Sequence, residues 1–195
     1  MRLFLALAIL LLSPALAFAH TGTGHSAGLL HGLEHPVGGI DHVLAMVAVG
    51  VFAFVLGGRA LILVPLSFVG MMIVGFALGV AHIEVPFVEL GIALSSIVIG
   101  TASALGRPMR VVIAAGLVGA FAIFHGYAHG SEMPGGTSGL TYAAGFTVTT
   151  ALLHLCGIAA SAGVARVIGG HGQMIARLAG GAFALGGLGV LAGWL

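Results

Sequence analysis

Two stretches of the chain combine histidine with carboxylate in a way that suits metal coordination. They have the sequences HPVGGIDH at residues 35–42 and HGYAHGSE at residues 125–132. Both border apolar runs, where an ionisable side chain is costly unless something compensates it. Imidazole nitrogen and carboxylate oxygen, without thiolate, suit borderline divalent ions such as Ni²⁺, Co²⁺ and Zn²⁺. The two stretches therefore predict a site that handles a divalent metal ion.

In the first stretch, proline and histidine predict the start of a helix. Pro36 suits the first helical position, which puts His35 at the cap. His42 follows His35 by seven residues, so we expect both on one helical face. Asp41 points to an adjacent face. From there it either binds the metal directly or accepts the second imidazole N–H of a ligating histidine.

In the second stretch, His125, His129 and Glu132 follow one another at spacings of four and three and form one helical stripe. At about 1.5 Å per residue, His125 lies about 10 Å inward from Glu132, and His42 lies about 9 Å inward from Pro36. We therefore expect the histidines of the two helices at matching depth. The predicted core ligands are Asp41, His42, His125 and His129, with His35 and Glu132 at the mouth.

Four further residues are weaker candidates for the same chemistry. His82, Glu84 and Glu89 mark an outer turn between two apolar segments. His154 lies about 22 Å along a later segment, in the inner half of the bilayer. There it serves either an exit step for the ion or a hydrogen bond between helices.

Composition predicts a membrane protein. Of 195 residues, 59% are hydrophobic and 6% charged, and the mean hydropathy is +1.22. This leaves too little polar surface for a water-soluble core. The net charge of +1 provides no basic field, which excludes nucleic acid as a partner. A single cysteine excludes an intramolecular disulfide and a cysteine-based metal cluster.

Residues 1–19 resemble a cleaved signal peptide, with Arg2, an apolar run and the small-residue site Ala17-Phe18-Ala19. The alternative is an uncleaved anchor helix. Cleavage leaves His20 as the mature N-terminus of an outer segment at residues 20–35. His20, His25 and His31 then belong either to a capture site for metal or to a flexible tail.

Residues 36–195 predict an all-α bundle of six transmembrane helices. The apolar segments cover roughly residues 36–57, 60–81, 86–105, 110–130, 139–162 and 174–194. Every arginine after the signal peptide falls on one side of this bundle, at positions 59, 107, 110, 166 and 177. By the positive-inside rule that side is cytoplasmic, so both mature termini face outward.

Small residues and aromatics predict how the bundle packs. Glycine pairs with four-residue spacing let helix backbones approach closely. These pairs are Gly75/Gly79, Gly126/Gly130 and Gly189/Gly193. Tyr127, Tyr142 and Trp194 are expected as anchors at the outer interface.

The two histidine stretches resemble the signatures of the HupE/UreJ family of hydrogenase and urease accessory membrane proteins. Residues 35–42 match the first-helix pattern His-Pro-x-x-Gly-x-Asp-His, and residues 124–132 match the fourth-helix pattern Phe-His-Gly-x-Ala-His-Gly-x-Glu. The signal peptide, length and six spans fit as well, so the resemblance covers the whole chain. It implies a nickel or cobalt permease of the bacterial inner membrane, with hydrogenase or urease maturation proteins as partners.

The favoured hypothesis is a secondary transporter rather than an enzyme. Ni²⁺ or Co²⁺ is then its substrate, no prosthetic group is expected, and no P-loop is present for ATP hydrolysis. Histidine must be neutral to bind metal, so protons should compete with the ion. One alternative is a membrane redox or hydrolytic enzyme that binds haem or a catalytic metal. Another is a metal-storage or insertion partner that does not transport.

Overall fold

A computed structural model of the chain describes residues 25–195, and all regular structure in that range is helical. The α-helices are α2 (His25–Gly38), α3 (Ile40–Leu56), α4 (Ala60–Val80), α5 (Val88–Leu105), α6 (Val111–Ser131), α7 (Gly139–Ile168) and α8 (Gly172–Leu191), and the 3₁₀ turn η1 is Gly169–His171. The expected all-α class is confirmed for this part of the chain. The expected signal peptide and His20 lie outside the described residues.

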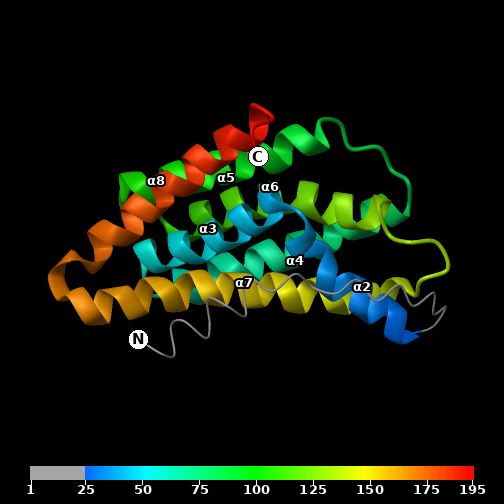
Figure 1. The fold of residues 1–195 in the computed structure, drawn as a ribbon, viewed down its shortest axis with the longest axis horizontal. Coiled ribbons are helices and arrows are strands. Elements are labelled where there is room, and N and C mark those ends of the chain that lie inside the picture. Colours follow the sequence, from blue (N-terminus) through cyan, green and yellow to red (C-terminus); the bar gives the residue numbers. More distant parts are fainter. Residues whose placement is uncertain (1–24) are drawn as a thin grey trace.

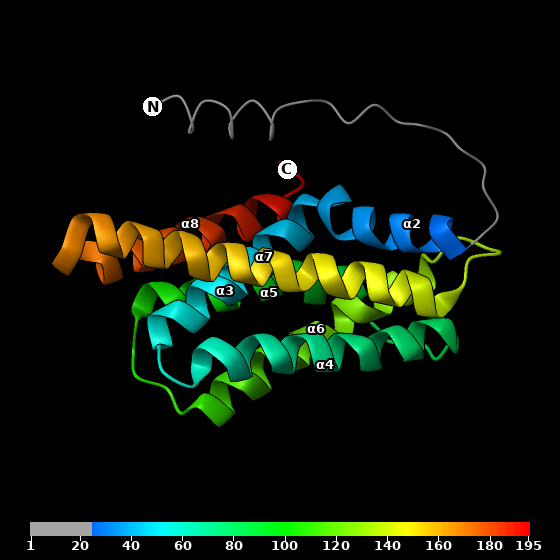
Figure 2. The same ribbon diagram turned by 90° about the horizontal axis from the view of Figure 1, so that it is seen from below.

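The helices form a bundle elongated along one axis (Figure 1). Figure 2 shows α4 and α6 on one side, α2, α7 and α8 on the opposite side, and α3 and α5 between them. Large apolar side chains fill the centre, among them Phe52, Phe68, Met72 and Phe146. Polar groups that lie among these side chains are therefore shielded from water.

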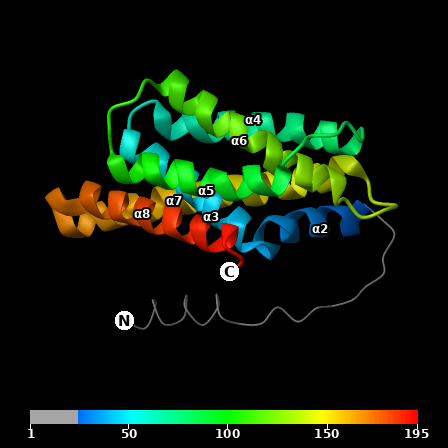
Figure 3. The same ribbon diagram turned by 90° about the horizontal axis from the view of Figure 1, so that it is seen from above.

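The connections between helices divide into two sets at opposite ends of the bundle. Figure 3 shows the α3–α4, α5–α6 and α7–α8 connections at one end and the α4–α5 and α6–α7 loops at the other. The first end carries Arg59, Arg107 and Arg110, and Arg166 and Arg177 belong to the last turn of α7 and the start of α8. This is the separation of arginines that we expected.

Several helices are apolar and long enough to cross a membrane. Within residues 25–195 there are four candidate spans by length and composition, or five if the bent pair α2 and α3 counts as one span. The fourth covers Gly139–Leu191, which η1 divides into α7 and α8. These helices are compatible with a protein that crosses the membrane several times. The count of six spans stays a prediction.

The first apolar segment differs from our prediction at its start. We expected a helix to begin at Pro36, but Pro36 lies inside α2, and α3 begins at Ile40. Gly39 separates the two helices in an extended conformation, and their axes differ by 83°. The Gly38-Gly39 pair explains the break, because glycine is weak in a helix interior and adopts other conformations easily.

Glycine packing between α4 and α6 is confirmed. A side chain at Gly126 or Gly130 of α6 would collide with the backbone carbonyls of Met72 and Phe76 on α4. The third expected pair is wrong, because Gly193 lies beyond α8, where an added methyl group would meet nothing within 4 Å. In α8 it is Gly180 that packs closely, on the backbone of α5.

We predict that Gly126→Ala lowers the stability of the bundle by about 1–3 kcal/mol, because the added methyl group meets the Met72 carbonyl and α4 must move away. The matched control is Gly116→Ala in the same helix, where a methyl group meets nothing within 4 Å. The measurement is reversible unfolding of both variants in detergent micelles. Equal stability of the two variants would contradict the close α4–α6 contact.

Candidate metal centre

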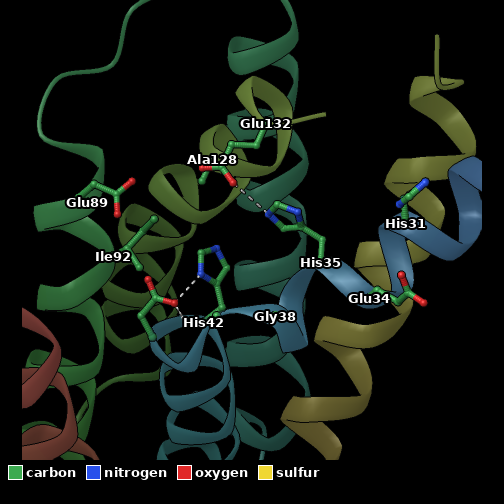
Figure 4. Close-up of a pocket in the computed structure, with 11 residues that line it drawn as sticks. His31, Glu34, His35, Gly38, His42, Glu89, Ile92, Ala128 and Glu132 are labelled. Atoms are coloured by element: carbon green, nitrogen blue, oxygen red, sulfur yellow. Dashed lines mark hydrogen bonds and ion pairs between the residues drawn. The ribbon is translucent and has the colours of Figure 1, made fainter. Parts of the chain in front are cut away.

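The residues of the two histidine stretches meet at a cavity of about 440 Å³. Its lining comes from α2, α3, α5 and α6. The residues are His31, Glu34, His35, Gly38, Gly39, Asp41, His42, Glu89, Ile92, Ala128 and Glu132. Figure 4 shows His35, His42 and Glu132 turned toward the same hollow, with Glu89 facing them from α5. Helices distant in sequence thus contribute imidazole and carboxylate groups to one space.

Four imidazole rings form a continuous cluster beside this cavity. The ring centroids of His42 and His125 are 4.7 Å apart, and those of His42 and His129 are 5.2 Å apart. His35 lies 4.7 Å from His129 and 6.2 Å from His42 by the same measure. The histidines of α3 and α6 therefore lie at the same depth in the bundle, as we expected.

Asp41 holds the ring of His42 in a defined orientation. Asp41 Oδ1 accepts the backbone N–H of His42 at 2.7 Å and lies 3.1 Å from His42 Nδ1. The carboxylate has no proton to give when ionised, so the ring donates its Nδ1–H to Asp41. This leaves the lone pair on Nε2, which is buried and has no hydrogen-bond partner among residues 25–195. A carboxylate behind a ligating histidine is a common arrangement at metal sites.

Ser95 of α5 holds His125 in a comparable way. The Ser95 hydroxyl donates to the Ile92 carbonyl at 2.6 Å and lies 2.9 Å from His125 Nε2. A hydroxyl has one proton, so Ser95 accepts the Nε2–H of the ring. The lone pair of His125 is then on Nδ1, which is fully buried and unpartnered within the described part of the chain.

Within that part of the chain, His129 has no polar partner for either ring nitrogen. Its ring is fully buried and stacks on Phe146 of α7, with centroids 4.6 Å apart and an interplanar angle of 4°. His35 covers it from the cavity side, and His35 Nε2 lies 3.5 Å from Glu132 Oε2. A group that enters the cavity therefore meets His35 and Glu132 before His129.

The donor atoms do not converge on one point. Among residues 25–195, no three histidine, cysteine, aspartate or glutamate side chains are placed to hold one metal ion. Several rings therefore bind the same ion only after a rearrangement, and the ring of His129 can turn without breaking a hydrogen bond to the described residues. The spacing also bears on haem, because rings as close as those of His42 and His125 leave no room for a porphyrin between them.

Comparison with known proteins identifies the family of the chain. The family model described as "HupE / UreJ protein" matches residues 7–190. The chain belongs to the HupE/UreJ family. One relative is "Protein HupE" of Rhizobium leguminosarum bv. viciae, which is 45% identical over 181 residues, or 92% of each chain. No solved structure matches the chain.

The weaker candidates of this HupE/UreJ chain lie in three different places. Glu89 lines the cavity beside Asp41. His82 and Glu84 are exposed in the loop between α4 and α5 and do not line it. His154 is buried in α7 and lies outside the cavity lining.

Several residues around the site were not expected from the sequence. Glu34 lines the cavity, and its position next to His35 was the only signal for it. Ser95 contacts His125 across 30 positions of sequence, for which no local pattern exists. Tyr142 was expected at the membrane interface, which is wrong. The Tyr142 side chain is fully buried, and its ring lies 6.0 Å from that of His35.

We predict that Ser95→Ala lowers the free energy of unfolding by about 1–3 kcal/mol, because it leaves the Nε2–H of buried His125 without an acceptor. Ser103→Ala on the same helix is the matched control, because Ser103 bonds only the Ile99 carbonyl of its own helix. Unfolding in detergent measures both variants. NMR of the imidazole nitrogens should also show a change for His125 in Ser95→Ala alone. Unchanged imidazole signals would contradict the assigned contact.

Proposed function

We propose that this chain is a secondary transporter for divalent transition-metal ions, with Ni²⁺ or Co²⁺ as cargo. The ion is substrate and not a resident cofactor. The metal then serves the maturation of enzymes such as hydrogenase or urease, in keeping with the family to which the chain belongs. We place the protein in the bacterial inner membrane with six spans, a cleaved signal peptide and both mature termini outside.

One observation supports this proposal above the others. Four imidazole nitrogens are buried beside the cavity without a hydrogen-bond partner among the described residues, namely His42 Nε2, His125 Nδ1 and both nitrogens of His129. Buried polar atoms are normally paired, because a lone one loses its bonds to water and gains nothing. An ion that accepts these lone pairs removes the cost. Neutral imidazole is a good ligand for Ni²⁺, Co²⁺ and Zn²⁺.

The charge around the cavity supports the choice of a cation. Four carboxylates line it, from Glu34, Asp41, Glu89 and Glu132, and the described residues of its lining include no arginine. Such a concave acidic surface raises the local concentration of cations. We propose that these carboxylates attract the hydrated ion, that His35 and Glu132 admit it, and that His42, His125 and His129 replace its water ligands.

We predict that His42→Ala and His129→Ala each reduce Ni²⁺ and Co²⁺ uptake into proteoliposomes to the level of protein-free vesicles. Wild-type uptake should also fall as the medium is acidified through the range in which histidine takes up a proton, because an imidazolium has no lone pair for the ion. The measurement is uptake of each ion over a pH series.

The control is His171→Ala, since His171 is exposed in η1 at the opposite end of the bundle and should not affect uptake. Tight metal binding by wild-type protein without any uptake would replace the transporter proposal with metal storage or insertion. A haem absorption band in the purified protein would favour an enzyme instead.

We predict that Asp41→Asn weakens metal binding by about 10–100-fold, because the carboxylate no longer fixes the tautomer and orientation of His42. Titration of Ni²⁺ into purified protein measures this loss. Glu84→Gln removes a carboxylate that does not line the cavity and should bind as wild type does. Equal affinities for Asp41→Asn and Glu84→Gln would show that Asp41 does not support the ligand.

A further inference from the structure

A second group of polarisable atoms lies deeper in the bundle, where α3, α4 and α7 meet. The hydroxyl of Thr150 on α7 lies 3.3 Å from Met46 Sδ on α3 and 3.6 Å from Met72 Sδ on α4. All three side chains are fully buried. One oxygen and two thioether sulfurs from three helices therefore converge inside an apolar core.

The orientation of Thr150 is unusual for a hydroxyl in such a helix. Ser103 and Ser161 donate to the carbonyl four residues earlier in their own helices, at 2.9 Å and 2.8 Å. That acceptor satisfies a hydroxyl at little cost. The Thr150 hydroxyl instead points at sulfur, which is a weak acceptor. The Thr150 hydroxyl therefore lies within 3.6 Å of both sulfurs, and it must turn its proton away from them before its oxygen binds an ion beside them.

His154 lies one helical turn beyond Thr150 on the same face of α7. Only 1% of the residue is exposed, and neither ring nitrogen has a hydrogen-bond partner within residues 25–195. Its ring contacts Phe68 of α4 at a centroid distance of 5.0 Å and borders an apolar groove between α4 and α7. Burying an imidazole without a hydrogen-bond partner costs free energy here, as it does for the histidines beside the cavity.

A column of contacts connects this deeper group with the outer histidines. Phe146, Thr150 and His154 follow one another at four-residue spacing along α7, and Phe146 stacks on His129. The ring of Phe68 lies 5.5 Å from His125 and 5.0 Å from His154. At about 1.5 Å per residue, His154 lies about 12 Å beyond Phe146 along the axis of α7. These contacts therefore connect the outer histidines with the inner group through Phe146 and Phe68.

We propose that Met46, Met72, Thr150 and His154 form a second, inner binding position for the same divalent ion. This inference rests on the proposed transport function, of which it is the next step. All donors here are neutral, whereas carboxylates surround the outer position. Thioether sulfur is softer than the outer ligands and matches Ni²⁺ or Co²⁺ less closely than imidazole does. The inner position should therefore hold the ion more weakly and pass it on.

The test uses variants that keep side-chain volume and remove the donor atoms. Met46→Leu combined with Met72→Leu removes both sulfurs, and volume-conserving changes of this kind are well tolerated in cores. Met71→Leu is the matched control, because Met71 is next to Met72 in sequence but packs toward Gly119 of α6. His154→Gln removes the imidazole as an independent second variant.

We expect the double methionine variant and His154→Gln to bind one Ni²⁺ with wild-type affinity at the outer position but to transport it at least about tenfold more slowly, a difference of about 1.4 kcal/mol in the barrier. Met71→Leu should transport as wild type does. Uptake by the double variant equal to that of Met71→Leu would overturn the inner position. Loss of outer affinity in the double variant would also overturn it, because the effect would then be structural.

X-ray absorption at the nickel edge tests the inner position without transport. In protein that carries His42→Ala and His129→Ala, nickel should show a sulfur neighbour, and adding the two Met→Leu changes should remove it. Sulfur neighbours together with a wild-type protein that never transports would keep the inner position and refute the permease. Transport by wild type with no sulfur neighbour in the outer-site variant would refute the inner position and keep the permease.

Discussion

The contact between His35 and His42 depends on the 83° bend between α2 and α3. In one straight helix their seven-residue spacing would separate them by about 10 Å along the axis, whereas the bend leaves 6.2 Å between ring centroids. The bend is held from outside the hinge, since the Thr149 hydroxyl of α7 donates to the Leu33 carbonyl at 2.8 Å. Close backbone packing of Gly32 on Tyr142 and of Gly145 on Leu29 holds α2 against α7 as well, so that His35 stays over His129.

The site combines fixed and free nitrogen atoms. Asp41 and Ser95 each bind one nitrogen of a histidine, and in both cases the second nitrogen stays unpaired among the described residues. The pairing sets the tautomer, so the free nitrogen carries a lone pair. The apolar packing of α4 on α6 and of α5 on α8 must supply the stability that these unpaired atoms cost. Close glycine contacts suit that purpose, because helices in a membrane gain most from tight packing.

Sequence patterns predicted what is local to one helix. Apolar runs located α3 to α8, with α7 ending six residues later than expected, but they missed α2, which lies largely in the expected outer segment at residues 20–35. The spacing of His125, His129 and Glu132 predicted that they share one face of a helix. The break at Gly39 was missed because proline is commonest at the first position of a helix, whereas Pro36 lies in the last turn of α2. Contacts between helices cannot be predicted from the spacing of residues within one helix, which is why the contact of Ser95 with His125 was not expected.

The proposed inner position would also meet a kinetic requirement of transport. An ion must bind tightly enough to give up its water ligands, and each binding position must then release it again. A single high-affinity site meets only the first of these requirements. Exchange between a charged outer position and a neutral inner one divides the energy of dehydration into smaller steps. The neutral donors Met46, Met72 and Thr150 are fully buried in the bundle, where a charged ligand is costly. The neutral chemistry of these donors therefore suits their burial inside the bundle.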